Sequence, residues 1–442
     1  MKKKLLSFIL AGTMTAAMLS GCGASSGSES TAESSEETAE GDEEAAEAAA
    51  ESTTETASDG EYDLTLYSIM TTDPDFDTWL ADVEEGTGLK INVIAAPTDS
   101  DTRQQKVTTM LSTGDSSVDV LEINDEMATT FKNSGWLEAL NDTVMTEDVA
   151  GKFAEGYVSQ MITATDGSII GVPGYTGYLA FWVNQEIMDE VGIDSIDTKE
   201  DFLAYMKAAS GNGRYGYGGS WEKTYVFNEI AQFVNMFGGD YYDWTNPNNK
   251  EAMEFLYELV KDGYTSLDQL ADKYEQMNPK AIDGNYGCWF YWGTGSEYAN
   301  ADMLDETKIH QTMVPCFSED GQRYIFTDSW SYVLNAASEH KEAAEKFLSY
   351  MASEGGMKAS YECFDRYPAR ADVAETVVPD TDPAKAMYTE YAENCNVTGR
   401  PMLPQTMEFI SAMGTIFQQY VSDQITIDDF LTQAQSYVEQ YQ

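Results

Sequence analysis

The chain has 442 residues, of which 42% are hydrophobic and 12% aromatic, and its formal net charge at pH 7 is −51. So negative a charge excludes a surface that tracks nucleic-acid phosphates, and it disfavours anionic ligands unless a local basic pocket overrides it. Neutral and cationic ligands remain, and the chain after residue 60 is long enough to bury the cores of two lobes.

The N-terminus has the features of an export signal. Lysines at positions 2–4 precede the apolar stretch LLSFILAGTMTAAM, which is too short to remain as a membrane span. The following LSGC, at residues 19–22, resembles the lipobox of bacterial lipoproteins, in which a peptidase cleaves before the cysteine and the thiol receives a lipid. We therefore expect residues 1–21 to be a signal peptide and Cys22 to carry the lipid, with palmitate among its acyl chains, on the outer face of the cell membrane.

An acidic linker is predicted after this cysteine. Residues 23–60 are almost only Gly, Ala, Ser, Thr, Glu and Asp, with no aromatic or basic side chain. Such a composition cannot form a core, and its like charges repel one another and extend the chain. We expect residues 22–60 to be disordered and to hold a folded body away from its membrane anchor.

The folded body begins with alternating strand and helix patterns. Strands are predicted over residues 63–69, 89–96 and 118–124, and helices over residues 75–88, 103–114 and 126–136. Strand, helix and strand with short connections predict βαβ units and a largely parallel sheet.

The pattern changes from residue 168 onward. SIIGVP (168–173) and LAFWVN (179–184) predict two strands that are joined by the glycine-rich turn GYTG. Further strands are predicted over residues 285–293 and 324–337, and helices over residues 199–210, 228–239, 249–263, 339–356, 408–422 and 427–441. No internal repeat accompanies these elements.

The cysteines and histidines give no sign of a metal centre. Cys288, Cys316, Cys363 and Cys395 permit three disulfide connectivities in an exported chain, and four free thiols are equally compatible with the sequence. No C-x-x-C spacing occurs, and the chain has only two histidines. We expect no zinc site and no cofactor.

One segment partly matches a calcium-binding loop. Asp73, Asp75, Asp77 and Glu84 occupy suitable positions, but Thr78 stands where the loop requires glycine. The same segment is a good amphipathic helix, so we expect no metal ion there.

Five motifs occur in a characteristic order over residues 62–442. They are MLSTGDSSVDVLEIN (110–124), GSIIGVPGYTGYLAFWVNQEIMDEVGI (167–193), LNAASEHKEAAEKFLSYMAS (334–353), GRPMLPQTMEFISAM (399–413) and ITIDDFLTQAQ (425–435). Together they resemble the extracellular solute-binding proteins of ABC importers, in particular the sugar-binding group that includes maltose-binding protein. One stretch departs from the family pattern: in CWFYWGTGSEY, Trp289 replaces a methionine and Gly295 a tryptophan, which puts a maltodextrin ligand in doubt.

The resemblance implies an α/β, two-lobed periplasmic-binding-protein-like fold of type II, with a hinge of two to three chain crossings. We place these crossings near residues 174–179, 313–317 and 364–368. Lobe 1 would then contain residues 61–175 and 316–364, and lobe 2 residues 176–315 and 365–442.

The resemblance also implies a non-catalytic receptor that binds a neutral sugar or oligosaccharide between its lobes. Its partners would be two permease subunits and a cytoplasmic ATPase, and the receptor itself would be a monomer. Two alternatives stay open: a polyamine or other cation as ligand, which suits the acidic chain and its aromatic residues, and a surface glycosidase.

Sugar rings need flat aromatic platforms and planar hydrogen-bonding groups, and the sequence offers both. The predicted platforms and clamp are Tyr175, Tyr178, Trp221, Trp289, Trp292, Trp330 and Arg370. The predicted polar partners at strand ends are Asp73, Asn124, Asp125 and Glu126, because open α/β sheets bind ligands at the carboxyl edges of their strands. Each has a structural alternative: core packing for an aromatic residue, a surface ion pair for Arg370, and helix capping for Asp73 and Asp125.

Overall fold

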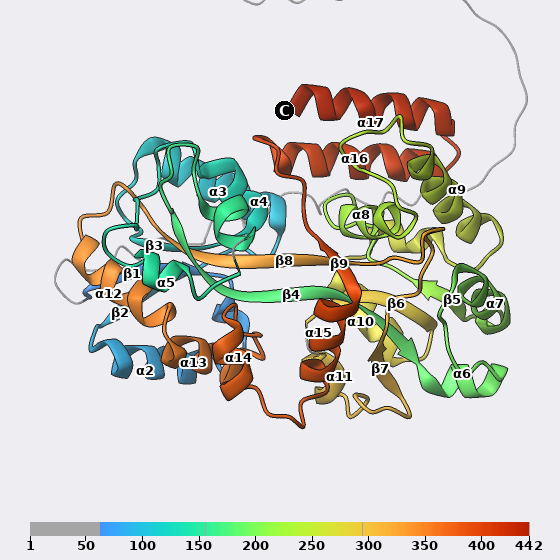
Figure 1. Cartoon of the computed structure of the whole chain (residues 1–442), viewed down its shortest axis with the longest axis horizontal. Coiled ribbons are helices and arrows are strands. Elements are labelled where there is room, and N and C mark those ends of the chain that lie inside the picture. The colour runs from blue at the N-terminus through green and yellow to red at the C-terminus, as the bar shows by residue number, and fades with distance from the viewer. Residues whose placement is uncertain (1–61, 155, 294, 442) are drawn as a thin grey trace, which may run out of the picture. The chain divides into compact units, whose positions relative to one another are not determined.

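The computed structural model describes residues 62–154, 156–293 and 295–441 (Figure 1). The predicted signal peptide, Cys22 and the predicted linker lie outside the described residues. The strands are β1 (Leu64–Ser68), β2 (Ile91–Ala95), β3 (Val120–Asn124), β4 (Gly171–Asn184), β5 (Tyr215–Gly218), β6 (Tyr286–Trp292), β7 (Ile309–Thr312), β8 (Arg323–Leu334) and β9 (Cys395–Thr398).

Helices surround these strands. The first are η1 (Met70–Thr72), α2 (Phe76–Thr87), α3 (Ser100–Thr113), α4 (Asp125–Phe131), α5 (Glu147–Ala150), η2 (Tyr157–Ile162), α6 (Gln185–Val191), α7 (Lys199–Ala209), α8 (Phe227–Met236) and α9 (Pro247–Lys261). The others are η3 (Leu267–Ala271), α10 (Tyr274–Ile282), α11 (Ser296–Asn300), α12 (Lys341–Met351), α13 (Glu354–Phe364), α14 (Ala371–Val377), α15 (Pro383–Asn394), α16 (Thr406–Val421) and α17 (Ile427–Tyr441).

The strands follow the order β2-β1-β3-β8-β4-β6-β5, with β7 beside β4 and β9 beside β8. The predicted βαβ units are confirmed, because β1 pairs in parallel with both β2 and β3. Beyond them the sheet is mixed. Strand β8 runs antiparallel to β3 and β4, and β4 antiparallel to β6 and β7, whereas β5 pairs in parallel with β6 and β9 in parallel with β8. The prediction of a largely parallel sheet therefore holds for only part of it.

The predicted turn at residues 174–177 is absent, and β4 runs through it as one strand. A bulge between Pro173 and Tyr175 is the only break in its pairing with β8 along the described ladder. A Cβ atom on Gly174 would lie 2.8 Å from Cε2 of Tyr332. Glycine therefore serves here to let two strands approach closely, and not to reverse the chain.

The helix predicted over residues 339–356 is two helices, α12 and α13. The break lies at Ser353, whose side chain accepts a hydrogen bond from the backbone of Gly356 and so caps α13. A serine followed by glycines was a signal for a new helix that the apolar periodicity concealed.

Two hydrophobic cores define two lobes. The core of lobe 1 includes Val172 and Val333, and the core of lobe 2 includes Phe181 and Phe326. Strands β4 and β8 thus contribute to both cores and run side by side between them (Figure 1). The predicted two-lobed α/β fold is confirmed.

The residue limits of the lobes remain a proposal, which the packing refines. Phe317 packs in the lobe 2 core although the predicted boundary assigned it to lobe 1. Val373 packs in the lobe 1 core although it was assigned to lobe 2. We therefore propose crossings near residue 328 and after α14, in place of residues 313–317 and 364–368.

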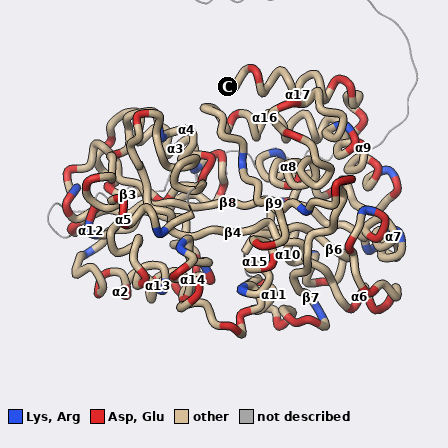
Figure 2. Tube along the Cα trace, viewed as in Figure 1, with Lys and Arg blue, Asp and Glu red and all other residues tan. Residues whose placement is uncertain are grey.

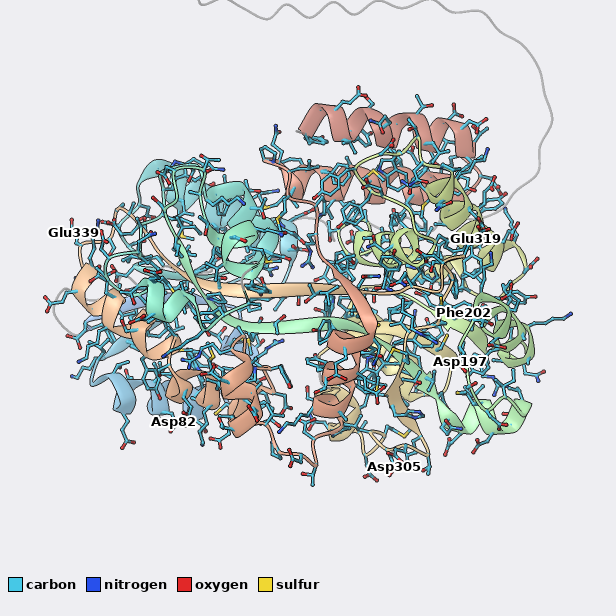
Figure 3. The ribbon with its side chains drawn as sticks, in the orientation of Figure 1. Asp82, Asp197, Phe202, Asp305, Glu319 and Glu339 are labelled. Atoms are coloured by element: carbon cyan, nitrogen blue, oxygen red, sulfur yellow. The ribbon has the colours of Figure 1, made fainter. Side chains whose placement is uncertain are left out.

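Charged side chains cover the surface and apolar side chains fill the cores. Acidic residues are spread over both lobes (Figure 2). Asp82, Asp305 and Glu339 lie at the periphery, whereas Phe202 is completely buried in lobe 2 (Figure 3). Among the described residues no helix has the length and apolarity of a membrane span, no three metal-binding side chains converge, and the four cysteines after Cys22 are free.

Candidate functional site

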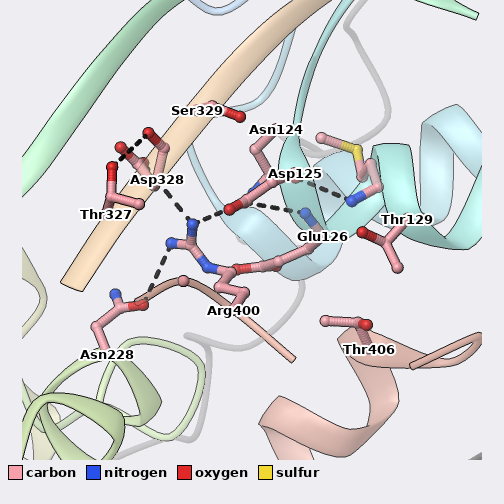
Figure 4. A network of polar contacts seen from close by, with 12 residues as sticks. Asn124, Asp125, Glu126, Thr129, Asn228, Thr327, Asp328, Ser329, Arg400 and Thr406 are labelled. Atoms are coloured by element: carbon pink, nitrogen blue, oxygen red, sulfur yellow. Dashed lines mark hydrogen bonds and ion pairs between the residues drawn. The ribbon is translucent and has the colours of Figure 1, made fainter. Parts of the chain in front are cut away.

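A buried cluster of charged side chains joins the two lobes around Arg400 (Figure 4). Nη1 of Arg400 lies 2.7 Å from Oδ1 of Asp125, and Nε lies 2.7 Å from Oε1 of Glu126. Nη1 also lies 3.8 Å from Oδ2 of Asp328, and Nη2 donates a hydrogen bond of 3.2 Å to Oδ1 of Asn228. Only 7% of the Arg400 side chain is exposed, so these charges meet out of water.

The start of α4 positions the two carboxylates that come from lobe 1. Asn124 ends β3, and its side chain accepts a hydrogen bond from the backbone of Met127, which caps the helix. Asp125 and Glu126 then occupy the first turn, where free N–H groups and the helix dipole favour negative charge. The structure therefore brings Asp125 and Glu126 to Arg400 and gives Asn124 the capping role.

Arg400 comes from the opposite side, in the Gly-Arg-Pro segment between β9 and α16. Its position is fixed because β9 pairs with β8 and α16 packs in the lobe 2 core. The ring of Trp292, the last residue of β6, lies 5.6 Å from the guanidinium carbon. Trp292 is half-buried.

Burial raises the pKa of two carboxyl groups in the cluster, those of Asp125 and Asp328. It raises the pKa of Asp125 to about 7, because desolvation and repulsion by Asp328 and Glu126 outweigh the attraction of Arg400. Burial also raises the pKa of Asp328, against the attraction of Arg400 and Arg366. The carboxyl group of Asp125 can therefore both accept and donate hydrogen bonds near neutral pH.

An aromatic platform lies beside the cluster. Tyr175 of β4 and Trp330 of β8 are register partners, and their rings are nearly parallel, with centroids 6.3 Å apart and an interplanar angle of 14°. The guanidinium of Arg366 lies 4.7 Å from the Tyr175 ring, and that of Arg103 lies 5.4 Å from the Trp330 ring. Flat rings beside fixed donors are the surfaces to which a sugar ring binds.

A groove opens between the lobes next to the charged cluster. It has a volume of about 700 Å³ and is lined by α3 of lobe 1 and by α16 and α17 of lobe 2. Gln104 lines the groove, and its side chain donates a hydrogen bond of 2.7 Å to Glu126. The groove therefore reaches the residues that bind Arg400.

Two of the predicted tryptophans belong to the lobe 2 core instead. Trp221 is fully buried, and its Nε1 donates to Glu229 at 2.8 Å. Trp289 is fully buried as well, and its Nε1 donates to the hydroxyl of Tyr298 at 2.8 Å. Both are corrections to the predicted platform, because indole N–H groups that find internal partners need no contact with a ligand.

Three other predicted residues make contacts that do not include Arg400. Tyr178 packs edge-on against Tyr388, with ring centroids 4.9 Å apart. Arg370 binds both carboxylate oxygens of Asp372, at 3.0 and 2.6 Å, and Asp73 accepts a hydrogen bond from the backbone of Asp75. We therefore omit Tyr178, Arg370 and Asp73 from the site proposed below.

Sequence reasoning missed the basic side chains of the site. Arg103, Arg366 and Arg400 lie in three separate segments, and no spacing links them. One signal was present for Arg400: it stands inside the GRPMLP motif that carries part of the family resemblance. Asp328 and Asn228 gave no signal, because each occurs within an ordinary strand or helix pattern.

Comparison with known proteins decides the family. Residues 71–358 match the family described as bacterial extracellular solute-binding proteins. The chain belongs to this family. The solute-binding protein is also 28% identical, over 276 residues, to an arabinooligosaccharide-binding protein of Halalkalibacterium halodurans. That match covers 58% of this chain and 58% of the relative, so the chain spans little more than half the length of this relative.

Solved structures share the fold of the solute-binding protein. An ABC transporter solute-binding protein from Thermotoga lettingae, bound with α-D-tagatose, has a TM-score of 0.74 and 20% identity, over 86% of this chain and 99% of that one. An ABC substrate-binding protein from Listeria monocytogenes, in complex with cycloalternan, has a TM-score of 0.73 and 17% identity, over 85% and 98%. At these identities the likeness concerns the fold alone.

Proposed function

We propose that this solute-binding protein is the lipid-anchored receptor of an ABC importer and that it binds a neutral sugar or oligosaccharide between its lobes. The family of binding proteins and the carbohydrate ligands named for its relatives support this proposal. Bound sugar would leave chemically unchanged and pass to permease subunits that a cytoplasmic ATPase drives.

The observation that carries the proposal is the buried cluster around Arg400, next to the half-buried Trp292. Planar charged groups that already bind one another hold fixed hydrogen-bonding directions. A sugar hydroxyl can add to such a network, and the indole offers its face to the C–H groups of the ring. Asp125, Glu126, Trp292, Trp330 and Arg400 form the core of the proposed site.

The alternative cationic ligand is less compatible with this arrangement. Three guanidinium groups, those of Arg103, Arg366 and Arg400, already lie on the rings where a polyamine would bind. A glycosidase would need two carboxyl groups free to act on a glycosidic bond. Asp125 and Asp328 are both engaged by the same arginine, so the site is better suited to binding than to catalysis.

Closure of the lobes would convert binding into a signal. A ligand that contacts residues of both lobes stabilises the closed form relative to the open one, by its difference in affinity for the two forms. Arg400 and Asp125 come from different lobes, and their side chains lie 2.7 Å apart. Their ion pair would then be a contact that marks the closed form.

Titration calorimetry tests this function on the full chain. The probes are arabinotriose, xylotriose, maltotriose and spermidine, and we expect binding of at least one neutral trisaccharide and none of spermidine. Trp292→Ala should weaken that binding by about 10- to 100-fold, because it removes the stacking surface. Binding of spermidine alone, or release of reducing ends from a trisaccharide, would contradict the proposal.

Arg400→Leu should also weaken binding, since it leaves Asp125 and Glu126 buried without a counter-charge. Its control is Arg214→Leu, which removes an arginine that pairs with Glu190 at 2.8 Å on the surface of lobe 2. Thermal unfolding of both ligand-free variants separates a loss of binding from a loss of folding.

A further inference from the structure

Three carboxyl groups surround one buried guanidinium where the two lobes meet (Figure 4). An oxygen of Asp125 and an oxygen of Glu126 each lie 2.7 Å from a nitrogen of Arg400. An oxygen of Asp328 lies 3.8 Å from the same guanidinium. One positive charge therefore faces three groups that can each carry a negative charge. The excess is costly in a buried place, and a proton on one carboxyl group reduces it.

The guanidinium and two of its carboxylate partners are fixed to different lobes. The hydroxyl of Tyr241 donates to the backbone oxygen of Gly399, and the backbone N–H of Met402 donates to the hydroxyl of Tyr242 at 2.7 Å. These two hydrogen bonds hold the backbone on both sides of Arg400 to the loop that follows α8 in lobe 2. The carboxylates in the first turn of α4 belong to lobe 1, because α4 packs in the lobe 1 core. A rotation that opens the lobes therefore separates Arg400 from them.

Asp125 has a free oxygen at which a proton can bind. Its Oδ1 accepts a hydrogen bond from Arg400, and its Oδ2 has no hydrogen-bond partner. Both oxygens of Glu126 are engaged, one by Arg400 and the other by Gln104 at 2.7 Å. Desolvation raises the pKa of Asp125 to about 7 in the arrangement seen here. When the lobes open, water reaches this carboxyl group, and its pKa falls toward the ordinary value of about 4.

The other groups around this cluster leave the carboxyl groups to titrate. Charged and titratable side chains face Asp125 or its partners from α4, β8, η2, α10, the loop after α8, the loop after α13 and the segment before α16. They are Glu126, Asp328, Tyr157, Tyr274, Tyr241, Arg366 and Arg400. Burial raises the pKa of the three tyrosines above 10, and the arginines stay charged. A change of pH near neutrality therefore acts on the carboxyl groups of this cluster.

We propose that closure of the two lobes takes up one proton from solvent at the Arg400 cluster, with Asp125 as its first acceptor, and that opening releases it. Between about pH 4 and about pH 7 the closed form holds the proton and the open form does not. Each unit of rising pH in that range shifts the equilibrium toward the open form by up to about tenfold, and the shift ends above pH 7. This proton uptake rests on the lobe movement of the proposed function, but not on the identity of the ligand.

Small-angle X-ray scattering of the ligand-free full chain measures the movement at about pH 5.5 and about pH 8. The wild type should have the smaller radius of gyration at the lower pH. Asp125→Asn should lose most of this change, because an amide does not bind the proton. A general loss of charge repulsion at low pH cannot explain such a difference, since the variant keeps every other acidic residue.

Glu229→Gln is the matched control for scattering. Burial raises the pKa of Glu229 to about 7 as well, but its carboxyl group binds Tyr217 and Trp221 inside lobe 2. The variant therefore removes a buried carboxyl group that titrates in the same range without touching the contact between the lobes. Its radius should respond to pH as that of the wild type does.

Titration calorimetry with arabinotriose gives a second measurement, at about pH 6 in buffers of different ionisation enthalpy. Binding should take up about one proton in the wild type and close to none in Asp125→Asn. The dissociation constant of the wild type should rise about 10-fold between about pH 5.5 and about pH 8.

Two results overturn the proton uptake: a wild-type radius that does not change with pH, and a response of Asp125→Asn equal to that of the wild type. If no trisaccharide binds, the proposed function fails, and scattering still decides whether closure takes up a proton. Should Asp125→Asn unfold in a thermal scan, Asp328→Asn takes its place. It removes the second carboxyl group with a raised pKa and should also reduce the response.

Discussion

A buried carboxyl group behind the site gives the chain a distinct pH dependence. Glu229 accepts hydrogen bonds from the backbone of Ser220 at 2.9 Å, from Trp221 at 2.8 Å and from the hydroxyl of Tyr217. Burial nevertheless raises the pKa of Glu229 from 4.5 to about 7. Because the folded pKa lies above the unfolded one, the folded state keeps this proton between those values, and ionisation costs stability as the pH rises through 7.

Glu229→Gln should remove this dependence. Relative to the wild type, its free energy of unfolding should rise by up to about 3 kcal/mol between about pH 5 and about pH 8. Urea denaturation at both pH values measures the change, and Glu147→Gln, at an exposed residue of α5, is the control. A difference between variant and wild type that does not vary with pH would contradict the prediction.

Single residues were the hardest feature to predict from the sequence. Trp289 and Trp292 stand three positions apart in the same aromatic run, yet only Trp292 reaches the site, because β6 ends there. Asp125 and Glu126 were predicted correctly to lie at a strand end, since that position follows from the order of strand and helix alone. Their partner Arg400 could not be predicted, because the contact joins residues far apart in the chain.

Two ion pairs link the start of helix α3 to lobe 2. Asp99, which caps α3, lies 2.6 Å from Nζ of Lys273, and Asp101 lies 3.5 Å from Nζ of Lys223. The hydrogen bond from Lys273 holds the pKa of Asp99 well below its usual range. Both pairs are partly exposed, so each contributes no more than about 1 kcal/mol to holding the lobes together.

Lys273→Ala should therefore shift the ligand-free protein toward an open form. We expect a larger radius of gyration in small-angle X-ray scattering, and a smaller difference from the wild type at about 500 mM than at about 50 mM salt, because salt screens exposed pairs. Lys199→Ala is the control, since Lys199 pairs with Glu251 inside lobe 2, at 2.8 Å. An unchanged radius at low salt would show that the pair does not hold the lobes together.

Most elements were predictable and their connections were not. Periodicity identified the first three strands and the helices between them, since each buries one face locally. It failed at β4, where a glycine-rich run was taken for a turn, and at α12 and α13, where one apolar pattern continues across a capped break. In both places the decisive contact is with another element, such as Tyr332 against Gly174.

The proposed lipid on Cys22 would determine where the whole molecule works. Under this proposal Cys22→Ser should release the protein from the membrane, because the lipid would supply the binding energy. Phase partition in a cloud-point detergent measures this: the wild type should enter the detergent phase and the variant the aqueous phase. Cys395→Ser, at a free cysteine of the folded body, is the control. A variant that still partitions with detergent would argue for another mode of attachment.

The pair of strands shared by both lobes also determines how the molecule can move. Because β4 and β8 are hydrogen-bonded to each other along Gly171 to Tyr178, a sideways slip of one lobe past the other would break several backbone bonds at once. Bending the ribbon across its width breaks none of them. We expect the bend to occur at the bulge between Pro173 and Tyr175, so that the two lobes rotate about a single hinge axis.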